Sequence, residues 1–157
     1  YRVRKANRMP HDYLKRALAK TSQKTTIDET VIALAGHANE FDAIAVCGNS
    51  GTIVGSTVAY LMNKGLILVR KADSQDHSAH RVEGDDGYLR YIIIDDLMCT
   101  GNTVSHIIST VKNTWPKIQH VGTFLYLDRR WWAALPESET EKCAPEKSEN
   151  GDQNRVS

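Results

Sequence analysis

Residues 92–103, IIIDDLMCTGNT, constrain the fold more than any other part of the chain. Three consecutive isoleucines are typical of a strand buried on both faces, and they end in two adjacent carboxylates, Asp95 and Asp96. A turn of small polar residues follows, and a helical pattern begins at Thr103. The amides of such a turn and the N-terminus of a helix favour an anion such as phosphate.

The two carboxylates indicate a different partner, because they would repel a phosphate placed beside them. Asp95 and Asp96 are suited to accept hydrogen bonds from sugar hydroxyls or to help hold a cation that bridges to other phosphates. A sugar phosphate satisfies both halves of the segment.

The rest of the chain alternates short apolar runs with helical patterns. Continuous apolar strands separated by helices predict an α/β fold with a mostly parallel sheet flanked by helices on both faces. Ligands then bind at the carboxyl ends of the strands. The predicted strands are residues 43–46, 66–69, 91–94 and 121–127, and the predicted helices are a short one after Pro10, 26–40 with a capping box at Thr26 and Glu29, 52–62 and 103–112.

Length and charge predict one globular domain. The chain has 157 residues, with 20 basic and 19 acidic side chains. We expect the domain to span residues 1–135, because residues 136–157 hold six acids, three bases and almost nothing apolar, a composition typical of a disordered tail.

Several other classes of protein are not expected. Polar and turn-forming residues interrupt the uncharged run 43–63, so we expect no transmembrane helix. The N-terminal residues lack the pattern of a secretion signal. Three unpaired cysteines favour a reducing compartment, and we expect a cytoplasmic protein.

Residues 92–103 resemble the phosphoribosyl pyrophosphate (PRPP) signature of the phosphoribosyltransferase family, a hydrophobic strand, two acids and then Thr-Gly-x-Thr. The resemblance covers residues 41–127. It implies the family's type I, Rossmann-like fold with a minimal hood, since only residues 1–40 and a short segment after Leu127 remain to form one. It also implies that the 5′-phosphate is bound by Cys99, Thr100, Gly101, Asn102 and Thr103.

Two further segments are similar to family loops. Residues 47–51, CGNSG, stand at the place of the pyrophosphate loop, which implies binding by Gly48, Asn49, Ser50 and Gly51; other members often carry a basic residue where Ser50 stands. Residues 70–78, RKADSQDHS, are similar to the catalytic loop of orotate phosphoribosyltransferases. That similarity adds Arg70, Lys71 and His77 to Asp95 and Asp96 as expected catalytic residues, although Gln75 replaces a lysine of that loop.

The base is only partly constrained. Cys99 stands where 6-oxopurine enzymes of the family carry an aspartate, which argues against hypoxanthine and guanine. Tyr126, Arg129 and Trp131 follow the last predicted strand, where they are suited to bind a base or to pack in the core or at a dimer interface.

The resemblance therefore implies an enzyme that moves 5-phosphoribosyl from PRPP to adenine or to an orotate-like pyrimidine and releases pyrophosphate. It further implies a homodimer and Mg²⁺ held through PRPP near Asp95 and Asp96, with no metal bound by the protein alone. The alternative is a non-catalytic PRPP sensor that binds nucleic acid through a basic N-terminal arm. The basic residues of that arm are Arg2, Arg4, Lys5, Arg8, Lys15, Arg16, Lys20 and Lys24.

Overall fold

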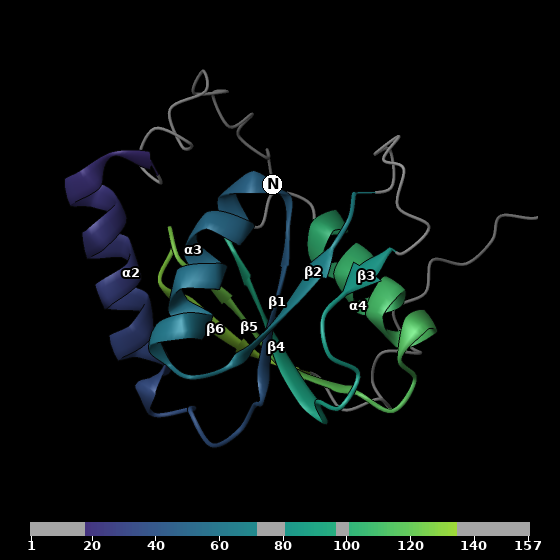
Figure 1. Ribbon diagram of the computed structural model, residues 1–157. Coiled ribbons are helices and arrows are strands. Elements are labelled where there is room, and N and C mark those ends of the chain that lie inside the picture. Colours follow the sequence, from purple (N-terminus) through teal and green to yellow (C-terminus); the bar gives the residue numbers. More distant parts are fainter. Residues whose placement is uncertain (1–17, 72–80, 97–100, 135–157) are drawn as a thin grey trace, which may run out of the picture.

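The computed structural model describes residues 18–71, 81–96 and 101–134, which form a six-stranded sheet with helices on both faces (Figure 1). The strand order is β3-β2-β1-β4-β5-β6. The helices are α2 (Lys20–Ala35), α3 (Gly48–Leu61) and α4 (Asn102–Thr114). The strands are β1 (Ala43–Cys47), β2 (Gly65–Val69), β3 (Val82–Glu83), β4 (Arg90–Asp95), β5 (Gln119–Leu125) and β6 (Arg130–Ala133).

The predicted α/β fold with a mostly parallel sheet is confirmed. Strands β2, β1, β4 and β5 pair in parallel, whereas β3 and β6 add antiparallel edges. The connection from β1 leads through α3 to β2, and the connection from β4 leads through α4 to β5, on the opposite side. The strand order therefore reverses between β1 and β4, and in such sheets the crevice beyond these two carboxyl ends is where ligands bind.

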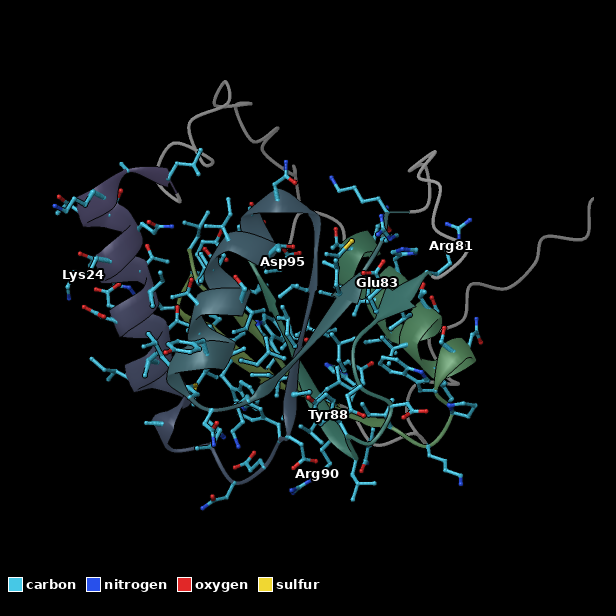
Figure 2. The ribbon with its side chains drawn as sticks, viewed as in Figure 1. Lys24, Arg81, Glu83, Tyr88, Arg90 and Asp95 are labelled. Carbon is cyan, nitrogen blue, oxygen red and sulfur yellow. The ribbon has the colours of Figure 1, made fainter. Side chains whose placement is uncertain are left out.

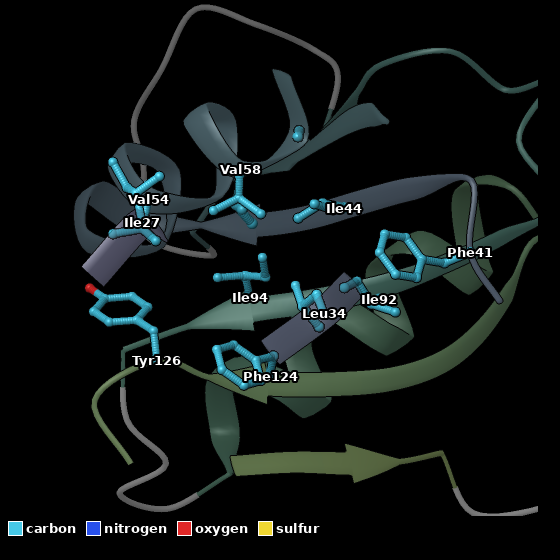
Figure 3. Close-up of a cluster of buried hydrophobic side chains, with 12 residues drawn as sticks. Ile27, Leu34, Phe41, Ile44, Val54, Val58, Ile92, Ile94, Phe124 and Tyr126 are labelled. Atoms are coloured by element: carbon cyan, nitrogen blue, oxygen red, sulfur yellow. The ribbon is translucent and has the colours of Figure 1, made fainter. Parts of the chain in front are cut away.

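The side chains of the central strands alternate between two apolar clusters, one on each face of the sheet. Ile44 and Val46 of β1 belong to the cluster that packs against α2 and α3 (Figure 3). Ala43 and Ala45 belong to the cluster on the α4 face. Burial on both faces explains why the strands read as continuous apolar runs in the sequence.

The predicted capping box is wrong. Thr26 and Glu29 lie inside α2, which begins at Lys20 and ends at Ala35 rather than running over residues 26–40. Hydroxyl side chains inside the helix do not end it, because they donate to carbonyls of the preceding turn; Thr30 Oγ1, for example, lies 2.7 Å from the Thr26 oxygen. The short helix predicted after Pro10 lies largely outside the described residues.

Other element boundaries also differ from the prediction. Helix α3 begins at Gly48 rather than at residue 52, and the last parallel strand is Gln119–Leu125 rather than residues 121–127. The edge strands β3 and β6 were not predicted. None of the helices in the described part of the chain is long and apolar enough to cross a membrane.

Candidate active site

Two carboxylates follow one another at the end of β4, beside the point where the strand order reverses. Figure 2 labels the first of them, Asp95. The Asp95 side chain is buried, with an exposed fraction of 6%, and its Oδ1 accepts a hydrogen bond from the Asp96 amide at 2.9 Å. Burial raises the pKa of Asp95 to about 6, and the negative charge of Asp96 adds to the rise, while the Asp96 amide and the Lys71 ammonium oppose it. Asp95 is therefore ionised at neutral pH, but at a cost in desolvation.

The N-terminus of α4 follows β4 and lies in the predicted phosphate cradle. Gly101 is the N-cap of this helix and adopts φ +75°, a left-handed conformation that glycine takes without strain. Asn102 and Thr103 are exposed in the first turn, which carries no acidic residue. This part of the cradle is suited to an anion. Cys99 and Thr100 lie outside the described residues.

The predicted pyrophosphate loop is not a separate loop but the first turn of α3. Gly48, at φ +73°, turns the chain from β1 into the helix within one residue, which explains why α3 starts earlier than its sequence pattern suggested. Asn49, Ser50 and Gly51 complete this turn. A Cβ atom built on Gly51 would lie 3.7 Å from Asp95 Oδ1, so the turn packs directly beside the carboxylates.

Lys71 lies over this first turn of α3. A Cβ atom built on Gly48 would lie 3.0 Å from Lys71 Cε and 3.5 Å from Nζ. The ammonium group lowers the pKa of both Asp95 and Cys47, although burial outweighs it and the pKa of the Cys47 thiol is raised overall. The structure thus brings Lys71, the α3 turn and Asp95 together. His77 and Gln75 lie outside the described residues.

Arg70 is directed instead to strand β3. Its Nε and Nη2 atoms lie 2.9 and 2.5 Å from Oε1 of Glu83. Its carbonyl oxygen lies 2.9 Å from Nε2 of His106, on α4. The sequence singled out neither Glu83, which lies in a polar segment without periodicity, nor His106, which lies on a regular helix. A signal for Glu83 would have required knowing that β3 pairs with β2, and a signal for His106 would have required knowing that α4 lies beside the end of β2.

The three predicted base-binding residues are placed differently from one another. Tyr126 is buried at one end of the α2 and α3 cluster (Figure 3), and its hydroxyl donates to the Ser50 carbonyl at 3.4 Å. Burial raises the pKa of Tyr126, and the negative charges of Asp96 and Asp95 raise it further. Tyr126 therefore lies beside the carboxylates.

Arg129 and Trp131 are held by contacts elsewhere. Arg129 forms an ion pair with Glu29 of α2 at 2.7 Å. The Trp131 ring stacks on His37 with 4.3 Å between ring centroids, and it covers Gly122, so it extends away from the carboxyl ends of the strands. Core packing accounts for Trp131.

The two carboxylates fit a magnesium ion only in part. Carboxylate oxygens are the ligands that Mg²⁺ prefers, and Mg²⁺ is commonly bound by one or two carboxylates together with substrate phosphates. The described residues contain no group of three or more His, Cys, Asp or Glu side chains that could hold a metal ion. Asp95 and Asp96 thus fit an ion that arrives with a phosphorylated substrate.

Comparisons of the sequence with known proteins give relatives but no matching family model. Adenine phosphoribosyltransferase of Caldicellulosiruptor saccharolyticus is 33% identical over 103 residues, which cover 56% of this chain and 59% of the relative. Orotate phosphoribosyltransferase of Pyrobaculum calidifontis is 29% identical over 91 residues, which cover 57% of this chain and 46% of the relative. The chain thus spans about half of the length of these curated relatives.

Solved structures agree with these relatives in fold. Orotate phosphoribosyltransferase from Aeropyrum pernix superposes with a TM-score of 0.56 at 18% sequence identity, covering 68% of this chain and 58% of the other. The predicted resemblance to the phosphoribosyltransferase family is confirmed, and so is the α/β fold that it implied.

Proposed function

We propose that this chain is a phosphoribosyltransferase that moves 5-phosphoribosyl from PRPP to a nitrogen of a nucleobase and releases pyrophosphate. One observation carries the proposal: a buried, desolvated carboxylate, Asp95, lies where the strand order reverses, next to the first turn of α3 and ahead of the first turn of α4. Two helix N-termini and a carboxylate pair suit a sugar that carries phosphate groups at two positions.

Each part of the site has a distinct task in this reaction. The first turn of α4, with Gly101, Asn102 and Thr103, binds the 5′-phosphate and fixes the sugar. Asp95 and Asp96 accept hydrogen bonds from the ribose hydroxyls. The C1–oxygen bond breaks with its electron pair on the departing pyrophosphate. The base nitrogen forms the new bond to C1 with the electron pair of its N–H bond, and the proton of that N–H bond passes to water.

Electrostatics favours the transition state over the bound substrate. Positive charge develops at C1 as pyrophosphate leaves, and the buried Asp95 carboxylate interacts with it more strongly than an exposed one would. The first turn of α3 and Lys71 lie together and are suited to the negative charge that grows on pyrophosphate. We propose that His77, in the segment after Lys71, also stabilises the departing pyrophosphate.

Magnesium and a second subunit complete the proposal. Mg²⁺ bound through PRPP near Asp95 and Asp96 would supply further neutralisation of the leaving group. A homodimer is expected from the family resemblance. The base is adenine or an orotate-like pyrimidine, the two acceptors named in the curated relatives.

Pyrophosphate release tests this function. The protein is mixed with PRPP and Mg²⁺ in the presence of orotate, uracil, adenine, hypoxanthine, guanine or xanthine in turn, and pyrophosphate is measured. We expect release that depends on adenine or orotate. The variant with both Asp95→Asn and Asp96→Asn keeps the fold and loses nearly all turnover. Near-normal turnover in that variant would refute the role given to the carboxylates.

A PRPP-binding regulator is the second candidate, and one contact favours it. Arg70, an expected catalytic cation, is paired with Glu83, while Ser50 gives the α3 turn no charge. A regulator would bind PRPP without releasing pyrophosphate for any base. It would also bind nucleic acid in a salt-sensitive way that PRPP modulates. If no nucleobase causes pyrophosphate release but calorimetry shows PRPP binding, the regulator is the correct candidate.

A further inference from the structure

We infer that Arg70 is a positioning residue rather than a cation for pyrophosphate: with Glu83 and His106 it anchors the chain so that Lys71 lies over the first turn of α3. The inference rests on the proposed function, because it concerns how that site binds its pyrophosphate group. It changes the role that the sequence led us to expect for Arg70.

Three contacts hold Arg70 on both its side chain and its backbone. The guanidinium donates from Nε and Nη2 to Oε1 of Glu83, on β3. The Arg70 amide donates to the carbonyl of Arg81 at 3.0 Å, which continues the pairing of β2 with β3 by one residue. The Arg70 carbonyl accepts from His106 on α4. Two neighbouring elements, β3 and α4, thus fix the end of β2.

The hydrogen bond from His106 determines the orientation of the next residue. A carbonyl oxygen can only accept, so His106 Nε2 carries the hydrogen, and Nδ1 faces the Thr110 hydroxyl at 3.5 Å. The Arg70 carbonyl and the Lys71 amide belong to the same planar peptide group. Because this peptide plane is fixed, the Lys71 side chain can adopt fewer orientations.

The position of Lys71 agrees with this constraint. A lysine side chain is long and this one is exposed, yet it extends over Gly48. Its ammonium group lowers the pKa of Cys47 and of Asp95. Because α4 also begins at the phosphate cradle, His106 links the cradle helix to the residue that carries the positive charge. The anchor therefore couples the two anion-binding ends of the site.

Removal of Glu83 gives opposite results for the two roles of Arg70. An acid near a polyanion site weakens binding by repulsion, and its loss would also free the Arg70 guanidinium for the ligand. If Arg70 bound pyrophosphate, Glu83→Ala would strengthen binding. An anchor predicts weaker binding, because the loss of the fixed position of Lys71 outweighs the relief of repulsion.

The experiment measures the affinity of the whole chain for PRPP and, separately, for inorganic pyrophosphate, both with Mg²⁺, by calorimetry. Lys71→Met should weaken binding by about tenfold or more, the range for a hydrogen bond to a charged group. His106→Ala and Glu83→Ala should each weaken it by about three- to tenfold. His106→Gln, whose amide can donate in place of Nε2, should restore most of the affinity. Ser109→Ala, an exposed change on the same helix, serves as the control.

The double variant of His106→Ala and Lys71→Met separates positioning from a general effect on stability. If His106 acts through Lys71, the double variant binds no more weakly than Lys71→Met alone. An additive loss, or stronger binding by Glu83→Ala, would overturn the inference. Pyrophosphate binding that follows this pattern without PRPP binding would keep the anchor and refute the proposed function, and failure of the unmodified chain to bind either ligand would refute both.

Discussion

Asp95 combines two properties at the scale of a single residue: it is needed in its charged form by the proposed reaction, and the fold disfavours that form. Its carboxylate is buried and stands beside a second carboxylate. Its Oδ1 accepts a hydrogen bond from the amide of the adjacent residue. We expect the chain to be less stable with Asp95 ionised than with a neutral side chain of the same shape.

Asp95→Asn should therefore stabilise the fold at pH 7.5 while it abolishes turnover. The pKa of Asp95 rises from 3.8 to about 6 on folding, so the folded protein holds the proton more tightly than the unfolded chain. Stability from this group is fully present below about pH 4 and is lost as the pH rises through about 6. The gain from Asn is on the order of 1–2 kcal/mol at pH 7.5.

Urea unfolding at pH 7.5 and at pH 4 measures this effect. The gain should be present at the higher pH and nearly absent at the lower one. Asp128→Asn removes an exposed carboxylate and should change the free energy of unfolding by less than about 0.5 kcal/mol. A lower stability of Asp95→Asn at pH 7.5 would show that the carboxylate is stabilised by contacts that outweigh its burial.

At the scale of elements, the close packing of α3 on β1 positions the first turn of the helix. A Cβ atom built on Gly55, in the middle of α3, would lie 2.3 Å from Cγ1 of the buried Val46. The helix lies so near the strand that a side chain at this position does not fit. The distance between α3 and β1 also sets where Gly48 and Ser50 stand relative to Asp95.

Gly55→Ala should destabilise the protein by about 1–3 kcal/mol, because the methyl group forces α3 away from β1. PRPP affinity should fall in the same variant, since the first turn of α3 moves with the helix. Gly36→Ala is the matched control: it has open space around its Cβ position and φ −66°, so alanine there should be neutral or slightly stabilising. Equal effects of the two substitutions on thermal unfolding would contradict this account.

Strand β6 gives a second prediction at this scale. Trp131→Ala should lower stability by about 2–3 kcal/mol, because the ring packs on His37 and Gly122 and contributes to the α2 and α3 cluster. PRPP affinity and the choice of base should stay unchanged. Trp132→Ala, on the more exposed neighbouring side chain, should cost much less. A changed base preference in Trp131→Ala would support the base-binding role predicted from the sequence.

The sequence predicted the elements whose signal is local. Strands β1 and β4 are short runs of apolar residues buried on both faces, β2 is a short apolar run that is partly buried, and the helix after Gly101 follows a regular pattern. Each was therefore found from its own residues. The carboxylates at the end of β4 were likewise found, because strand, acids and turn are contiguous.

The elements that were missed depend on contacts distant in the sequence. Strand β3 has two residues and forms because β2 offers its edge, and β6 forms by pairing with β5. The start of α3 depends on Gly48 adopting a positive φ beneath Lys71. The Arg70 contacts with Glu83 and His106 join three elements, and no local pattern indicates them.

At the scale of the whole molecule, the sheet and its two apolar clusters lie within residues 27–133, and the site lies at one end of that sheet. All the cluster residues come from one contiguous stretch of the chain. Stability should therefore come from this stretch, whereas the acidic composition of residues 136–157 offers little apolar surface to bury.

Deletion of residues 136–157 tests the expected domain boundary. The shortened chain should keep the melting temperature within a few degrees and keep its PRPP affinity, because the removed residues carry almost no apolar side chains. Thermal unfolding and calorimetry are measured on both forms. A large loss of either property would place part of the working domain beyond residue 135.

The central place of β1 bears on how the chain reaches its fold during synthesis. One edge of β1 pairs with β2, which follows after a single helix, but the other edge pairs with β4, where Ala43 meets Tyr91. Until β4 leaves the ribosome, this edge of the buried strand β1 stays unpaired and open to other chains. Because β1 and β4 are far apart in the sequence, we expect the pairing that creates the crevice at Asp95 to form late and to leave the nascent chain open to aggregation until then.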